Sequence, residues 1–263
     1  MIGDLAHAAP GLLAAWVHDL DPYAIELWSG GPIRWYGLSY LAGFLIAYLL
    51  IRRIASVGRS PLHPARAGDL VITLAIGIVV GGRLGYVVFY RPELFLQWSD
   101  APPFWAVLAI NQGGMASHGG MIGGVLASVW FARRHRVPWL HVADLFAFGA
   151  PLGLFLGRVA NFVNGELFGR RCDPDFPLAV KFPQELHDDP DLAGRAIRAV
   201  EARGLDPWQT GQDAIVWIIG QVQRGNSEIV AALRPLLTPR HPSQLYAAVT
   251  EGLVVFAVLF IAW

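Results

Sequence analysis

The chain has 263 residues, of which 54% are hydrophobic and 15% charged, with a mean hydropathy of +0.44 and a net charge of zero. This composition excludes a soluble domain of this size and predicts a polytopic membrane protein. Cys172 is the sole cysteine, which excludes an intramolecular disulfide and a cysteine-ligated metal site. We expect no metal, no organic cofactor and no nucleic-acid partner.

Five apolar segments are predicted to cross the membrane as helices. They cover about residues 33–51, 68–89, 113–132, 142–162 and 244–263. Residues 1–34 mix apolar and turn-forming side chains and are predicted to form a short interfacial helix and a turn. The predicted fold class is an all-α polytopic membrane protein with about five transmembrane helices and a small extracytoplasmic head domain of mixed structure.

The distribution of arginines predicts the orientation. The connectors at 52–66 and 133–136 hold four and three arginines, whereas the loop at 90–112 holds one. Short connectors rich in arginine face the cytoplasm, so the N-terminus and the segment after the fourth helix are placed outside. That segment contains a predicted helix near residues 192–203 and β-branched runs such as residues 214–219.

These features predict four regions along the chain. They are an interfacial segment (1–32), helices one to four with the site motifs (33–169), the head domain (170–240) and a fifth helix (241–263).

The fourth helix ends in a polar segment, residues 157–170, with the sequence GRVANFVNGELFGR. Arg158, Asn161 and Asn164 recur every third residue, so a helix places them on one side. Charged groups at membrane depth cost roughly 2.5 to 3.5 kcal/mol each and seldom lack a partner or a function. Either this stripe faces a binding site, with Glu166 pairing an arginine, or it is a polar seam between two helices.

Arg83 is a second arginine inside an apolar segment. At about 1.5 Å per residue, Arg83 and Arg158 both lie roughly 22 to 24 Å from the inner edge of a core of about 30 Å. Two guanidinium groups near the outer surface can clamp a phosphate, since their donors match phosphate oxygens. The alternative for Arg83 is a structural ion pair or a side chain that reaches the membrane surface.

His118 begins the third predicted helix and is followed by Gly119 and Gly120, with two more glycines at 123 and 124. Glycines permit close approach of a ligand or of a neighbouring helix, and histidine suits base chemistry near neutral pH. A packing histidine is the alternative. The segment HPSQLY, His241 to Tyr246, is typical of a helix start at the membrane surface.

Together these motifs resemble prolipoprotein diacylglyceryl transferase, a family of bacterial inner-membrane enzymes. The resemblance runs from about Ile33 to Trp263 and is carried by WYG at 35–37, GGRLGY at 81–86, SHGG at 117–120, residues 157–169 and HPSQLY at 241–246. It implies that activity depends on Tyr36, His118, Arg158, Asn161, Glu166 and Gly169. We expect the catalytic residues to be His118, Arg158 and Tyr36, and the substrate-binding residues to be Arg83, Gly119, Gly120, Asn161, Asn164, Glu166, Gly169, Gln244 and Tyr246.

The resemblance also implies the reaction and its partners. The thiol of a lipobox cysteine in a prolipoprotein signal peptide attacks the glycerol carbon of phosphatidylglycerol, a membrane lipid, which yields a thioether and releases glycerol 1-phosphate. In this scheme His118 takes the thiol proton and Arg158, with Arg83, holds the phosphate. The implied location is the inner membrane, with the head domain outside.

Two further expectations follow from the sequence. A lipid-binding or transporter-like protein without chemistry is the alternative function, because the GR motifs at 82–83 and 157–158 weakly resemble a repeat. The fifth predicted span is short and has no basic residue after it, whereas the family continues into further membrane helices. We therefore expect these residues to be a truncated form of a longer protein, poorly stable and weakly active or inactive.

Overall fold

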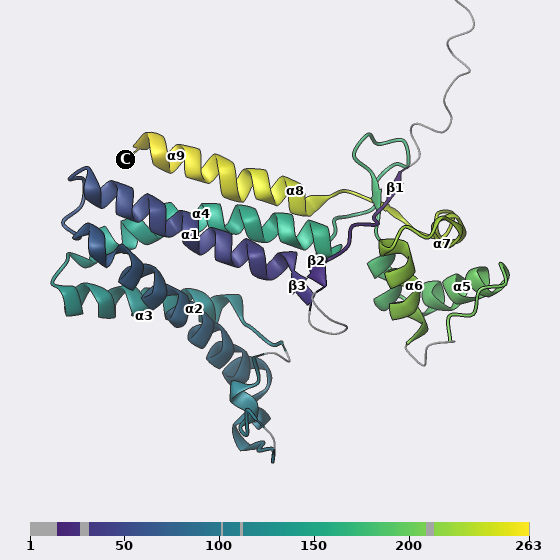
Figure 1. The fold of residues 1–263 in the computed structure, drawn as a ribbon, viewed down its shortest axis with the longest axis horizontal. Helices are drawn as coiled ribbons and strands as arrows, with labels where there is room; N and C mark the ends of the chain where they lie inside the picture. The colour runs from purple at the N-terminus through teal and green to yellow at the C-terminus, as the bar shows by residue number, and fades with distance from the viewer. Residues whose placement is uncertain (1–14, 27–31, 101, 111–112, 209–212, 263) are drawn as a thin grey trace, which may run out of the picture. The chain divides into compact units, whose positions relative to one another are not determined.

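The computed structural model describes residues 15–26, 32–100, 102–110, 113–208 and 213–262 (Figure 1). The chain divides into two compact units, each assembled from segments that are distant in sequence. One unit comprises residues 1–40 and 154–254, and the other comprises residues 41–153 and 255–263.

Four helices of the described chain are long and apolar enough to cross a membrane, which supports the polytopic class. The first three are α1 (Trp35–Ser56), α2 (Ala67–Tyr90, after the 3-10 turn Pro64–Arg66) and α4 (Trp139–Asn164). The fourth is a continuous helix, Ser243–Ala262, that consists of α8 (Ser243–Ala247), the π-helical segment η6 (Ala248–Val254) and α9 (Val255–Ala262). They coincide with the first, second, fourth and fifth predicted spans.

The third predicted span is a helix, α3 (Ser117–His135), but it is not one of these four. Four glycines and the basic last turn Arg133, Arg134 and His135 make it less apolar than the others. The structure therefore confirms a helix at each of the five predicted positions, and four of these helices are long and apolar enough to cross a membrane, while the number of spans stays a prediction.

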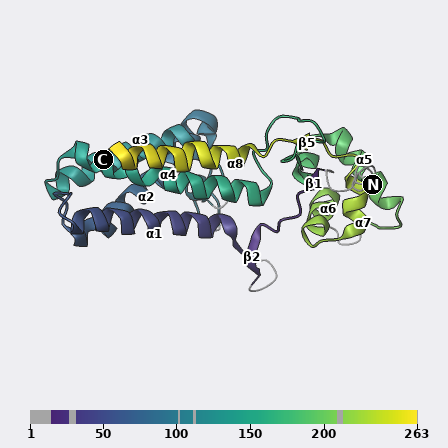
Figure 2. The same ribbon diagram turned by 90° about the horizontal axis from the view of Figure 1, so that it is seen from above.

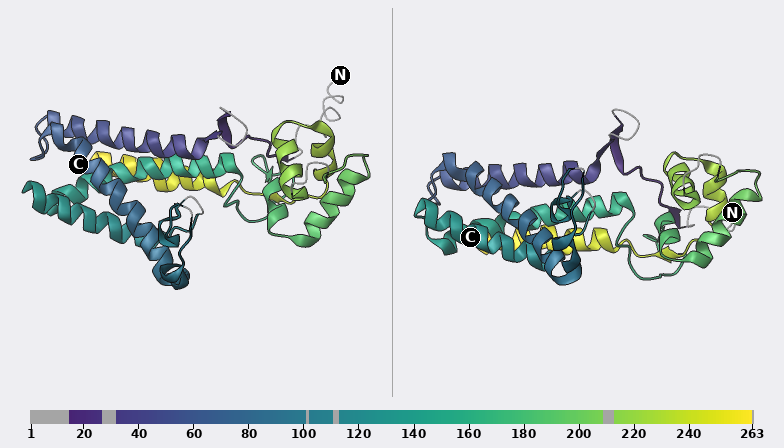
Figure 3. Two further views of the ribbon diagram at one scale, coloured as in Figure 1. Left: turned by 60° about the horizontal axis from the view of Figure 1, so that its bottom comes forward. Right: turned by 90° about the horizontal axis from the view of Figure 1, so that it is seen from below.

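In the second unit, α2 and α3 pack with their backbones almost in contact (Figures 1 and 3). A methyl group added at Gly123 would lie 2.0 Å from the carbonyl oxygen of Gly77, and one added at Gly119 would lie 2.3 Å from that of Gly81. Glycines spaced by four residues let membrane helices approach this closely. A core that includes Ile51, Leu70, Phe131, Val142 and Leu145 fills the rest of this unit.

The loop between α2 and α3 contains two short 3-10 helices, η2 (Pro92–Leu96) and η3 (Ala106–Leu108). Trp98 forms an isolated antiparallel bridge with Trp105, and their rings stack at 5.6 Å. The loop therefore has ordered structure of its own, which the sequence did not predict.

The first unit contains a small domain of helices and short strands, visible in Figure 2. β1 (Trp16–Val17) pairs parallel with β4 (Val180–Lys181), which pairs antiparallel with β5 (Pro239–Arg240). The helical elements η5 (Pro183–His187), α5 (Pro190–Glu201), α6 (Ala214–Gln223) and α7 (Ser227–Leu233) enclose a core that includes Leu186, Val200, Ile218, Ile229 and Leu233. Side chains of Asp189, Asp213 and Asn226 cap α5, α6 and α7.

Two segments of this unit test predictions from the sequence. α5 covers the predicted helix near residues 192–203, whereas the β-branched run 214–219 lies in helix α6, because one face of that segment is buried in the core. The predicted interfacial helix is not found in the described part of residues 1–34, which instead forms β1 and the hairpin of β2 (Tyr23–Glu26) with β3 (Pro32–Arg34). Residues 1–14 and 27–31 lie outside the described chain.

Candidate active site

The polar stripe of α4 ends in a turn that folds the chain back over the helix. Gly165 has a φ of +70°, and its N–H donates to the carbonyl of Phe162 at 2.9 Å. The N–H of Glu166 donates to the carbonyl of Asn161 at 3.1 Å. This pair of bonds is a Schellman motif, which a glycine in the left-handed conformation permits. It returns Glu166 to the last turn of α4.

There the carboxylate of Glu166 accepts hydrogen bonds from the amide side chains of the polar stripe. Its Oε1 accepts hydrogen bonds from Nδ2 of Asn161 at 2.8 Å and from Nδ2 of Asn164 at 3.3 Å. Asn161 Nδ2 also donates to the hydroxyl of Tyr36 at 3.5 Å. Four predicted site residues from α1, α4 and the following turn therefore come together.

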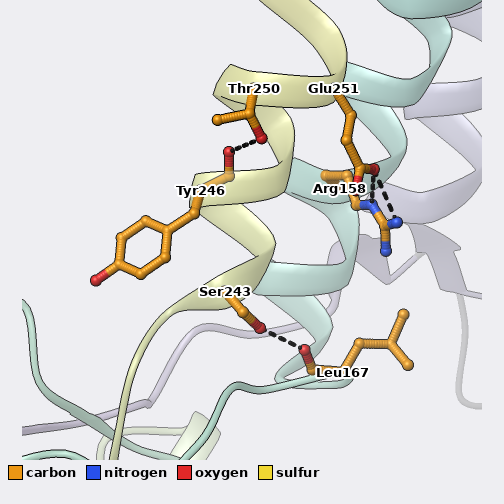
Figure 4. Close-up of polar contacts among 6 residues, drawn as sticks. All are labelled: Arg158, Leu167, Ser243, Tyr246, Thr250 and Glu251. Carbon is orange, nitrogen blue, oxygen red and sulfur yellow. Dashed lines mark hydrogen bonds and ion pairs between the residues drawn. The ribbon is translucent and has the colours of Figure 1, made fainter.

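The ion pair of Arg158 differs from the expectation that Glu166 would hold an arginine. Nε and Nη2 of Arg158 both donate to Oε2 of Glu251, at 3.1 and 2.9 Å (Figure 4). Glu251 lies in the π-helical segment and was not predicted as a site residue. A carboxylate within an apolar span is itself a signal of function, and it could have been found in that way.

After the turn, residues 166–170, which we call the signature segment, run beside the residues that precede α8. The N–H of Gly169 donates to the carbonyl of His241, and the N–H of His241 donates to the carbonyl of Arg170, each at 3.0 Å. A methyl group added at Gly169 would lie 2.6 Å from the His241 oxygen. The close pairing therefore explains this glycine in structural terms.

The first residues of α8 continue the same contact. Gln244, which is 1% exposed, donates from Nε2 to the carbonyl of Glu166 at 2.6 Å. Ser243 donates from Oγ to the carbonyl of Leu167 at 3.0 Å, as Figure 4 shows. These contacts favour a role for Gln244 in holding the signature segment, while its predicted contact with substrate stays a prediction.

A buried ion pair supports this segment from the side of the small domain. Glu185 is 3% exposed and accepts from Nε of Arg240 at 2.9 Å and from the N–H of Thr238 at 2.7 Å. Arg240 also donates to the carbonyl of Gly169 at 3.3 Å and lies over the Phe168 ring at 4.7 Å. Neither charged residue was predicted, because nothing in the sequence pairs them.

Tyr246 points away from Arg158 (Figure 4). Its hydroxyl is 3.3 Å from Nδ1 of His241, and the residue lines a cavity of about 700 Å³. The cavity walls are almost entirely apolar and include Trp16, Phe162, Leu178, Leu245 and Val249. Tyr246 therefore belongs to an apolar surface, separate from the polar cluster.

His118, Gly119 and Gly120 lie in the first turn of α3, in the other unit. The imidazole is exposed and makes no hydrogen bond with any residue that the structure describes. Gly119 packs against α2, whereas a methyl group at Gly120 would be 3.5 Å from the carbonyl of Ile78, an ordinary contact. Helix packing thus accounts for Gly119, and the predicted roles of all three in binding or catalysis remain predictions.

Arg83 is buried in the same unit, at 5% exposure. Its Nε donates to the carbonyl of Val107 at 2.7 Å and its Nη2 to that of Ala106 at 2.6 Å. Its Nη1 donates to the carbonyls of Gly113 and Gly114 at 2.6 and 3.2 Å. Four of the five guanidinium donors are therefore used by the loop before α3. This geometry favours a structural role, and phosphate binding by Arg83 stays an untested prediction.

Metal binding and nucleophilic catalysis by Cys172 have little support in the described residues. No group of three or more histidine, cysteine, aspartate or glutamate side chains among them is placed to hold a metal ion. Burial raises the pKa of the Cys172 thiol, and Asp173 adds to this effect. A raised pKa reduces the thiolate fraction, so Cys172 is a poor nucleophile.

Comparison with known proteins indicates the family of this chain. The family model described as prolipoprotein diacylglyceryl transferase matches residues 22–263. A phosphatidylglycerol–prolipoprotein diacylglyceryl transferase of Bdellovibrio bacteriovorus is 46% identical over 94% of this chain and 76% of its own length. Proteins of the same name from Rhodospirillum centenum and Paracidovorax citrulli are 39% and 36% identical, over 93% and 92% of this chain and 68% and 72% of their lengths. These matches do not favour a transporter, and the chain belongs to the prolipoprotein diacylglyceryl transferase family.

Proposed function

We propose that the protein transfers the diacylglyceryl group of phosphatidylglycerol to the cysteine thiol of a prolipoprotein lipobox. A carbon–sulfur bond forms at the glycerol carbon that carries the phosphate ester. The bond between that carbon and the ester oxygen breaks, so the oxygen leaves with the phosphate as glycerol 1-phosphate. This is the first step in the maturation of a bacterial lipoprotein.

The observation that carries this proposal is the guanidinium of Arg158 beside the cluster of Tyr36, Asn161, Asn164 and Glu166. The leaving phosphate is anionic, and a fork of N–H donors stabilises the charge that develops on its oxygens. Of the five donors, Glu251 uses one on Nε and one on Nη2, which leaves Nη1 available. The amides and the tyrosine hydroxyl offer further hydrogen bonds to the glycerol.

The attacking thiol must lose its proton, because the thiolate is the nucleophile. We assign this role to His118, whose exposed imidazole is free of hydrogen bonds within the described chain. An imidazole is the side chain most often used as a general base in proteins, and this one is accessible to an incoming thiol. The nucleophile comes from the substrate, so the poor reactivity of Cys172 is no obstacle.

The location and orientation belong to the proposal as well. The four apolar helices fit a bacterial membrane enzyme. We place the protein in the inner membrane with the N-terminus and the head domain outside, since the arginine-rich connectors face the cytoplasm.

The test incubates the purified protein with phosphatidylglycerol vesicles and a peptide that contains a lipobox. We expect glycerol 1-phosphate and a lipidated peptide in equal amounts. The matched control replaces the peptide cysteine with serine and should abolish both products. Release of glycerol 1-phosphate with the serine peptide would contradict the thioether mechanism, and absence of both products with the cysteine peptide would contradict transfer by this chain.

A further inference from the structure

The ion pair between Arg158 and Glu251 uses one particular edge of the guanidinium. Nε and Nη2 both donate to the same oxygen of Glu251, and Arg158 makes no other hydrogen bond with the part of the chain that the structure describes. The edge formed by Nη1 and the second donor of Nη2 is therefore open. Figure 4 shows the third nitrogen on the side away from Glu251. This edge has the spacing for a bidentate bond to a phosphate.

A special helix geometry brings Glu251 to this position. It lies in the π-helical segment Ala248–Val254, and π-turns are rare and concentrate at functional sites. The next residue, Gly252, packs against α4: a methyl group there would lie 2.6 Å from Cβ of Phe155. The absence of a side chain lets the two helices approach about one turn from Arg158. The close approach of the two backbones thus sets the position from which the Glu251 carboxylate reaches Arg158.

We propose that Glu251 is a positioning residue for Arg158, which fixes the Nε edge and directs the open edge at the phosphate of the lipid. The inference rests on the proposed function and extends it to a residue of the last helix. Glu251 itself does not touch the substrate. Both side chains remain accessible, at 32% and 47% exposure, so a lipid phosphate can reach the arginine without breaking the pair.

The test compares Glu251→Gln with Glu251→Ala. Glutamine keeps an oxygen that accepts from Nε and Nη2, so kcat should stay within about threefold of the unaltered chain. Alanine removes the acceptor, so Arg158 loses its orientation and kcat should fall roughly tenfold or more. Thr250→Ala is the matched control, because Thr250 is the neighbouring residue and its hydroxyl donates to the carbonyl of Tyr246 at 2.9 Å, away from Arg158. Its kcat should be unchanged.

Other outcomes would overturn the inference. If both variants gain activity, Glu251 competes with the phosphate; if both lose it equally, charge matters and orientation does not. If both keep full kcat and lose only thermal stability, the pair is purely structural.

Binding of glycerol 1-phosphate, measured by calorimetry, provides a readout that needs no turnover. The glutamine variant should match the unaltered chain, and the alanine variant should bind several-fold more weakly. Equal binding by all three would contradict the positioning role even in a preparation that catalyses no transfer. Failure of the transferase assignment is seen separately, as absence of product from the unaltered chain.

Discussion

Arginine serves two different purposes in this molecule, and the partners of each guanidinium distinguish them. Arg83 donates to four backbone carbonyls of one loop and is almost fully buried. Within the described residues, Arg158 donates to one carboxylate, that of Glu251, and keeps an open edge. Hydrogen bonds from charged donors contribute about 1.5 to 3 kcal/mol each, so removing Arg83 should affect the fold before it affects the chemistry.

We predict that Arg83→Lys lowers the free energy of unfolding by roughly 3 kcal/mol or more, since an ammonium cannot reach four carbonyls in a fork. Thermal unfolding in detergent would measure this loss. Arg158→Lys is the comparison: it should lose most activity while its melting temperature changes less. If Arg83→Lys unfolded like the unaltered chain and lost only phosphate binding, Arg83 would belong to the clamp.

His18 links stability to pH. It is fully buried, Nε2 lies 2.7 Å from the carbonyl oxygen of Phe162, and burial lowers its pKa below the ordinary 6.5. As the pH falls below about 6.5, the unfolded chain binds a proton at His18 that the folded chain resists, so the free energy of unfolding decreases. Above that pH the residue is neutral in both states and the effect vanishes.

Thermal unfolding between pH 5 and pH 8 should therefore show stability falling toward the acid end. His18→Gln should flatten the dependence, because the amide can still donate to Phe162 and does not titrate. The exposed His187 provides the control, and His187→Gln should leave the slope unchanged. An unchanged slope in His18→Gln would assign the dependence to other groups.

Elements at the site are held together by backbone contacts that leave no room for side chains. The signature segment and the start of α8 pair through Gly169 and His241, and the buried Gln244 extends the contact. Because Glu166 belongs to this segment, its position depends on residues more than 70 positions later in the sequence, as the Gln244 bond shows.

We predict that Gly169→Ala reduces transfer roughly 100-fold, since the segment must move by on the order of 1 Å to relieve the contact with His241. Gly157→Ala is the matched control within the same motif, because a methyl group there meets nothing within 4 Å. It should retain activity and gain helix stability. Equal activity of the two variants in the peptide assay would contradict the packing explanation.

On the scale of the whole chain, each compact unit combines segments that are distant in sequence. In one of them the glycine seam between α2 and α3 determines how closely two helices pack. The glycines near His118 differ in how closely they approach α2. A methyl group added at Gly119 or Gly123 would overlap the backbone of α2, whereas one added at Gly120 would make ordinary contacts.

Gly123→Ala should therefore destabilise the protein by about 1 to 3 kcal/mol, the usual cost of overpacking, because the new methyl group would meet the Gly77 carbonyl. Gly120→Ala, on the same helix, should cost much less. Unfolding in detergent would compare them. Equal stability of both variants would mean that the helices separate without penalty.

The sequence by itself determined the membrane class, the positions of four long apolar helices, the family motifs and the family itself, because apolar length and charged residues within an apolar run are local properties of the chain. Arg158, Asn161 and Asn164 are three residues apart, and this spacing predicted that they lie on one side of α4. Tertiary structure alone decided the partners: Glu251 for Arg158, two amides for Glu166 and four loop carbonyls for Arg83. Hydrogen-bond partners depend on distances between residues far apart in sequence, and a π-turn or a glycine contact that sets those distances leaves no periodic signal.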